Sequence, residues 1–174
     1  MKFKKSAYGY IIMVGHLCAD LGGGALPAIL PFLMVNRGIT YEAAAGLTFA
    51  LSSIGSLIQP LFGSMADKTS RPWLMSLGIL LSGCGVSMLG FFDNYWAMFA
   101  AVALTGVGSA LFHPDAGRMA NYVAGEAKGR GISNFSVGGN MGGALGPMLA
   151  VFGITLFGMK GTWQFPLCSC RSSW

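Results

Sequence analysis

The sequence predicts an all-α, polytopic membrane protein with five transmembrane helices, and three observations support this fold class. Hydrophobic residues make up 53% of the 174 residues and charged residues only 10%, whereas an ordinary soluble domain carries about 25% charged residues. Five apolar stretches each reach the roughly 20 residues that a helix needs to cross a bilayer. The basic residues lie between these stretches, which is typical of topology signals. We therefore expect a lipid bilayer around the chain and no nucleic-acid partner.

The first apolar stretch covers residues 8–35 and follows three lysines. A signal peptide also begins with basic residues, but its apolar region has only about 7 to 15 residues. Because this stretch is longer and four more follow it, we expect a retained transmembrane helix.

The next four helices are expected at residues 43–66, 73–92, 95–116 and 132–158. Trp73, Tyr95 and Trp96 stand where the third and fourth stretches begin, and aromatic side chains favour the membrane interface. The segments between the stretches are too short for an extramembrane catalytic domain. We expect residues 1–163 to form one transmembrane bundle. Residues 164–174 form an atypical tail that does not begin a sixth helix, which indicates a truncation or a frameshift.

The distribution of basic residues predicts the orientation of the chain. With the amino terminus in the cytoplasm, eight of the eleven Lys and Arg residues lie on the cytoplasmic side. The opposite side receives only Arg37, Lys160 and Arg171. This asymmetry follows the positive-inside rule, so we expect a multi-pass protein with a cytoplasmic amino terminus.

Asp20 is the most unusual residue of the first stretch. It lies twelve residues from the start of the stretch, which is about 18 Å along a helix and close to the bilayer centre. A carboxylate at that depth costs about 2.5 to 3.5 kcal/mol on insertion scales. His16 lies one turn earlier on the same face, so the two side chains can share a proton or a hydrogen bond. Either Asp20 hydrogen-bonds to a neighbouring helix, or it faces a water-filled pathway and binds and releases a proton there.

The fourth apolar stretch ends in His113, Pro114 and Asp115, and Arg118 follows. Proline removes a backbone hydrogen bond from a helix, so we expect a break at this position. The polar side chains either line a cavity or a cytoplasmic gate, or they lie at an interfacial helix end. The sequence leaves both interpretations open.

Glycines recur every four residues in the fifth stretch, at Gly138, Gly142 and Gly146, with a second row at Gly139 and Gly143. Such rows allow two membrane helices to approach closely. They do not form a phosphate-binding loop, which would need a preceding strand and a Gly-Lys-Ser or Gly-Lys-Thr ending. We therefore expect a helix contact along this face.

Enzymes and metalloproteins find no support in the sequence. Cys18 and Cys84 lie within apolar stretches, and Cys168 and Cys170 form a single C-x-C pair, so no metal or disulfide framework is predicted. No protease-like motif surrounds the serines of the second stretch. We expect no catalytic residue, no metal ion and no cofactor.

The segment between the second and third stretches reads Gly63-Ser-Met-Ala-Asp67-Lys68-Thr-Ser-Arg71. It resembles the signature loop of the major facilitator superfamily, G-x-x-x-D-R-x-G-R-R, with Lys68 in place of the first arginine and a serine in place of a glycine. The resemblance implies that Asp67, Lys68 and Arg71 form a charge cluster that controls which side of the transporter is open. It also implies that Arg118 is the partner of Asp67.

Three longer segments are similar to the fosmidomycin-resistance group of bacterial drug efflux transporters within this superfamily, namely residues 16–33, 111–120 and 133–147. Gly142, Gly146 and Pro147 also resemble the antiporter motif of the superfamily. Ala150 and Val151 replace the final two glycines of that motif.

The resemblance implies a secondary active transporter in the bacterial inner (plasma) membrane that exports small molecules or antibiotics, with protons as the coupling ion. The polar residues expected on the proton or substrate pathway are His16, Asp20, His113 and Asp115. Transporters of this superfamily have twelve helices in two halves, and the sequence accounts for most of the first half. The alternative is a non-transporting fragment, or a half-transporter that needs a separate second half or an oligomeric partner.

Overall fold

The structure, a computed structural model, describes residues 2–69 and 71–166, with side chains from residue 7 onward. In these residues the chain forms five long α-helices and one short 3₁₀ helix, and no strand occurs. The elements are α1 (Lys2–Arg37), α2 (Tyr41–Lys68), α3 (Pro72–Met88), α4 (Tyr95–Ala124), α5 (Lys128–Phe157) and the 3₁₀ helix η1 (Gly158–Trp163). The predicted all-α fold is confirmed.

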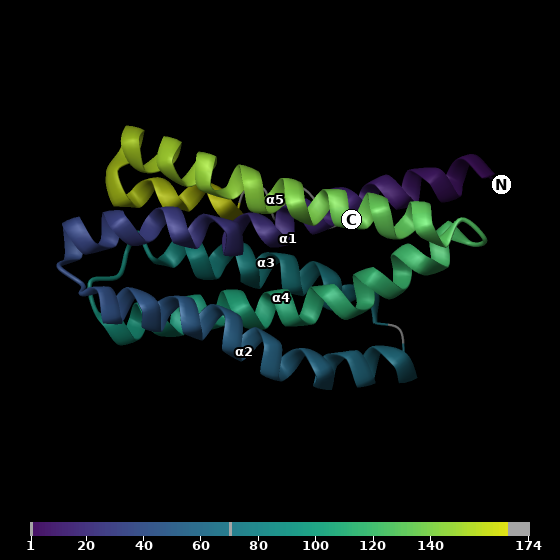
Figure 1. Ribbon diagram of the computed structural model, residues 1–174, viewed down its shortest axis with the longest axis horizontal. Helices are drawn as coiled ribbons and strands as arrows, with labels where there is room; N and C mark the ends of the chain where they lie inside the picture. Colours follow the sequence, from purple (N-terminus) through teal and green to yellow (C-terminus); the bar gives the residue numbers. More distant parts are fainter. Residues whose placement is uncertain (1, 70, 167–174) are drawn as a thin grey trace.

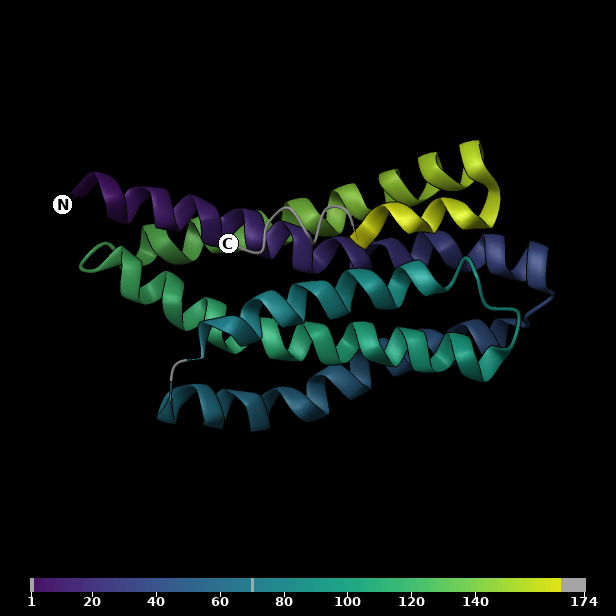
Figure 2. The same cartoon turned by 180° about the vertical axis from the view of Figure 1, so that it is seen from behind.

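Four helical segments are long and apolar enough to cross a membrane, namely Ala7–Arg37, Tyr41–Lys68, Tyr95–Ala124 and Lys128–Pro166. The apolar helix α3 has 17 residues. At 1.5 Å per residue it is about 26 Å long, near the lower limit for a transmembrane helix. The helices run side by side along the long axis of the molecule (Figures 1 and 2), as expected for a polytopic bundle.

The helices end at positions that differ from the apolar stretches. α3 ends at Met88 rather than near residue 92, and α4 continues past residue 116 to Ala124. The break expected at Pro114 is absent, because α4 is helical throughout. Gly125 ends α4 with a φ of 59°, which glycine adopts without strain. Hydropathy marks the part of a helix that lies in lipid, so it does not detect the polar turns that extend α4 and begin α5.

The predicted tail lies mostly outside the described residues. Residues 164–166 continue as a helix after η1, and residues 167–174, which include Cys168 and Cys170, are not described. The truncation or frameshift therefore stays a prediction.

Close contacts between glycines and neighbouring backbones bring the helices together. α1 packs along α5, while α4 packs along both α2 and α3. A Cβ atom on Gly108 of α4 would lie 2.6 Å from the carbonyl oxygen of Gly78 on α3. A Cβ atom on Gly146 of α5 would lie 2.8 Å from the backbone nitrogen of Ala25 on α1. No side chain fits in such spaces, so the approach of these helices depends on glycine.

The core combines apolar packing with buried hydrogen bonds between helices. Ile29 of α1 and Leu47 of α2 are fully buried in the same apolar cluster. The hydroxyl group of Ser82 on α3 donates to the carbonyl oxygen of Ala19 on α1 at 2.7 Å. Such a bond between membrane helices contributes about 0.6 to 2 kcal/mol. It ties α3 to the turn of α1 that carries Asp20.

Candidate functional site

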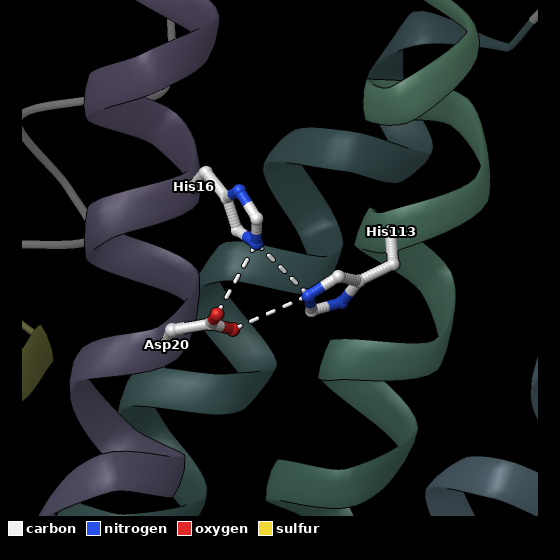
Figure 3. A group of neighbouring side chains, drawn as sticks. All are labelled: His16, Asp20 and His113. Atoms are coloured by element: carbon white, nitrogen blue, oxygen red, sulfur yellow. Dashed lines mark hydrogen bonds and ion pairs between the residues drawn. The ribbon is translucent and has the colours of Figure 1, made fainter. Parts of the chain in front are cut away.

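Two histidines and an aspartate meet between α1 and α4. His16 and Asp20 lie one turn apart on α1, and His113 lies on α4 (Figure 3). Nε2 of His16 is 3.2 Å from Oδ2 of Asp20, and Nε2 of His113 is 3.4 Å from Oδ1 of Asp20. The two Nε2 atoms are 3.1 Å apart. We call these three side chains the His–Asp–His cluster.

Backbone carbonyl groups fix the orientation of both histidines. Nδ1 of His16 donates to the carbonyl oxygen of Phe135 on α5 at 2.7 Å. Nδ1 of His113 donates to the carbonyl oxygen of Ser109, one turn earlier on α4, at 2.8 Å. A carbonyl oxygen only accepts hydrogen bonds, so each Nδ1 carries a proton. The Phe135 ring also stacks on His16, with the ring centroids 3.8 Å apart.

The cluster is partly open to a polar hollow. The side chain of His16 is 8% exposed, whereas those of Asp20 and His113 are 28% and 25% exposed. Asp20 borders a hollow of about 270 Å³ between α1, α2, α3 and α4. The other polar residues that line it are Ser52, Ser56, Gln59, Ser82, Thr105 and Ser109. Water or a small molecule can therefore reach a carboxylate that lies within the bundle.

Two glycines of α5 make room for the cluster. A Cβ atom on Gly139 would lie 2.6 Å from Nε2 of His16 and 2.9 Å from Oδ2 of Asp20. A Cβ atom on Gly142 would lie 3.1 Å from Cβ of Asp20. The sequence places both glycines in packing rows, and it places Gly142 in the antiporter-like motif. Their contact with the cluster follows only from the way α5 packs on α1.

The other members of the antiporter-like motif, Gly146 and Pro147, lie farther along α5. α5 is helical through Pro147. Gly146 packs against the backbone of α1 near Ala25, one turn beyond Asp20. The motif therefore borders the cluster at Gly142 and allows α5 to pack closely on α1 at Gly146.

Asp115, the fourth residue predicted for the pathway, does not join the cluster. It follows His113 by two residues on a continuous helix, which turns its side chain away by about 200°. The side chain is buried and forms an ion pair with Arg118, 3.5 Å away on the same helix. The structure thus separates Asp115 from the other three predicted residues.

The predicted gating residues lie at the junction of α2 and α3. Gly63, Asp67 and Lys68 belong to the last turns of α2, and Arg71 immediately precedes α3. Asp67, Lys68 and Arg71 are exposed, and none of them forms an ion pair with another residue that the structure describes. Arg118 pairs with Asp115 instead of Asp67. The gating role of these residues stays a prediction.

The three side chains of the cluster are of kinds that proteins also use to bind metal ions. One ligand atom from each of its three members lies within 4.8 Å of the others, and no second group of this kind occurs among the described residues. In the structure these atoms contact one another. A carboxylate between two imidazoles is also suited to binding and releasing a proton.

Comparisons with known proteins cover nearly the whole chain. The family model of the Major Facilitator Superfamily matches residues 12–170. The fosmidomycin resistance protein of Escherichia coli K12 is 32% identical over 167 residues, which cover 95% of this chain and 41% of that protein. YfnC of Bacillus subtilis 168, an uncharacterized MFS-type transporter, is 30% identical over 164 residues, or 93% of this chain and 40% of YfnC.

A multidrug resistance protein, MdtG of Escherichia coli 55989, is 28% identical over 146 residues, which cover 79% of this chain and 36% of MdtG. The chain therefore spans about two fifths of the length of the curated relatives that it matches.

Proposed function

The chain belongs to the major facilitator superfamily, and we propose that the intact protein is a secondary active transporter that exports small molecules in exchange for protons. The observation that carries this proposal is the His–Asp–His cluster beside a polar hollow inside a membrane bundle. Two relatives are named as fosmidomycin and multidrug resistance proteins, which supports antibiotics as substrates. We place the protein in the bacterial inner membrane with its amino terminus in the cytoplasm.

The cost of a buried charge explains how the cluster would couple transport to protons. A carboxylate at the bilayer centre costs about 2.5 to 3.5 kcal/mol, and an added proton removes the net charge. When the pathway opens to one side, water stabilises the charge and the proton can leave. A proton gradient therefore biases the equilibrium between the inward-open and outward-open states. Because the cluster joins α1 to α4, proton binding acts on the packing of these two helices.

The polar hollow is where we place the substrate on this half of the protein. Hydroxyl and amide groups line it together with Asp20, so it suits a small polar molecule that forms hydrogen bonds. Substrates of superfamily transporters bind near the midplane between two repeats. The opposite wall of the site would then come from the second half of the intact protein.

Replacing Asp20 with asparagine tests the proton role. The amide has nearly the same size as the carboxyl group but does not ionise, so we expect pH-gradient-driven efflux by the intact protein to fall to background in proteoliposomes. Fosmidomycin, after which one relative is named, is the first substrate to assay. Asp93→Asn is the matched control, because Asp93 is 77% exposed and pairs with Arg37 away from the cluster. Undiminished efflux by Asp20→Asn, with a normal amount of protein in the membrane, would exclude the proton role.

A further inference from the structure

The hydrogen bonds of the His–Asp–His cluster require an additional proton. Nδ1 donates to a carbonyl oxygen in both histidines, at 2.7 Å for His16 and 2.8 Å for His113. A neutral imidazole with its proton on Nδ1 has only a lone pair on Nε2. Both Nε2 atoms and the carboxylate of Asp20 would then be acceptors, with lone pairs facing each other across 3.1 to 3.4 Å. Figure 3 shows these atoms facing one another, and at least one more proton must lie between them.

The distances identify the atom that holds this proton best. A proton on Asp20 leaves the two Nε2 atoms, 3.1 Å apart, with their lone pairs facing each other. A proton on Nε2 of His16 can be shared with Nε2 of His113 at 3.1 Å and with Oδ2 of Asp20 at 3.2 Å. The one contact then left without a proton, between His113 and Asp20, is the longest of the three at 3.4 Å.

One additional proton makes the cluster neutral as a whole, whichever of the three side chains carries it, and the distances place it on His16. A doubly protonated His16 carries one positive charge, the ionised Asp20 carries one negative charge, and His113 is neutral. The cluster is then neutral as a whole, which is the state that a low-dielectric bundle favours.

Among the described residues, the helices around the cluster bring no unpaired charged side chain to it. On α4, the nearby Asp115 is already paired with Arg118. α2 contributes hydroxyl and amide groups around the hollow, and α3 contributes the Ser82 hydroxyl. α5 contributes the Phe135 carbonyl group and the bare backbone of Gly139.

We propose that the coupling proton is held between Nε2 of His16 and Nε2 of His113, with the Asp20 carboxylate as its counter-charge. The inference rests on the proposed function, because it assigns the proton of that transport cycle from the Asp20 carboxyl group to the pair of imidazoles. His16 lies on α1 and His113 lies on α4, so the shared proton links the two helices. When the proton leaves to water, two lone pairs face each other at this junction and favour its opening.

Nitrogen-15 labelling of histidine tests this assignment directly. The chain contains only two histidines, and both belong to the cluster. For the chain in lipid nanodiscs at and below neutral pH, we expect one imidazolium and one imidazole protonated on Nδ1. Raising the pH is expected to convert the pair to two neutral imidazoles, both protonated on Nδ1. Two neutral imidazoles at every pH, with the Asp20 carboxyl group titrating instead, would overturn the proposal.

Two variants and a chelator provide further tests of the proton's position. Asp20→Asn removes the counter-charge, so the imidazolium fraction at neutral pH is expected to fall at least about tenfold. Asp93→Asn, which changes an exposed carboxylate outside the cluster, is expected to leave both histidine signals unchanged. Histidine signals that change when EDTA is added would show a bound metal ion in place of the proton, and would also overturn the proposal.

The histidine spectra test where the proton lies, and the efflux assay tests the proposed function. Efflux by the intact protein that needs no pH gradient would refute the proposed function but would leave the histidine spectra as expected. Proton-coupled efflux together with two neutral histidines would refute only the location of the proton.

Discussion

Replacing Gly108 with alanine is expected to destabilise the helix bundle by about 1 to 3 kcal/mol. The added Cβ atom would lie 2.6 Å from the carbonyl oxygen of Gly78 and 2.5 Å from the backbone nitrogen of Ser82. Both are backbone atoms of α3, which cannot move aside as the end of a flexible side chain can, so α3 and α4 would have to separate. Because the Ser82 hydroxyl also bonds to α1, the separation would disturb a third helix.

Gly117, on the same helix, provides the matched control. A Cβ atom at Gly117 would meet nothing within 4 Å, and alanine is favoured over glycine within a helix by about 1 kcal/mol. Measured in the same detergent as the unsubstituted protein, the unfolding temperature is expected to fall for Gly108→Ala and to stay the same or rise for Gly117→Ala. Equal unfolding temperatures for the two variants would contradict the tight packing of α3 against α4.

Replacing Gly139 with alanine is expected to disrupt the His–Asp–His cluster and to abolish most proton-driven efflux by the intact protein. The added Cβ atom would lie 2.6 Å from Cε1 and Nε2 of His16 and 2.9 Å from Oδ2 of Asp20. His16 cannot simply turn away, because its Nδ1 is bonded to the Phe135 carbonyl group and its ring is stacked on Phe135. Misplacing a reactive group by about 1 Å can cost about a hundredfold in rate, so a loss of at least about tenfold is expected.

Gly143→Ala is the control for this substitution. Gly143 lies one turn after Gly139 on α5, and a Cβ atom there would meet nothing within 4 Å. The efflux rate and the histidine spectra are expected to change in Gly139→Ala. In Gly143→Ala both are expected to equal those of the unsubstituted protein. Parent-like efflux and unchanged spectra in Gly139→Ala would show that α5 does not constrain the cluster.

Spacing along one helix predicts contacts within that helix and little beyond it. His16 and Asp20 are four residues apart, so their contact follows from helix geometry alone. Arg118 shows the limit of such reasoning. Its pairing with Asp67 depends on how two different helices meet, and in the structure it bonds to Asp115 on its own helix. α4 also continues to Ala124, beyond the apolar stretch that ends at residue 116, because the loss of hydropathy marks the edge of the apolar region and not the end of the helix.

The amino-acid sequence alone predicts an all-α membrane bundle, because apolar length and the scarcity of charge are local properties that any arrangement of the helices must satisfy. It also predicts that Asp20 is costly in that setting and that His16 is its neighbour. The packing of the helices, in contrast, makes His113 the third member of the cluster and brings a carbonyl group and a glycine of α5 against His16. These contacts join residues about one hundred positions apart in the chain, and they exist because the packing of α1 against α4 and α5 brings them together.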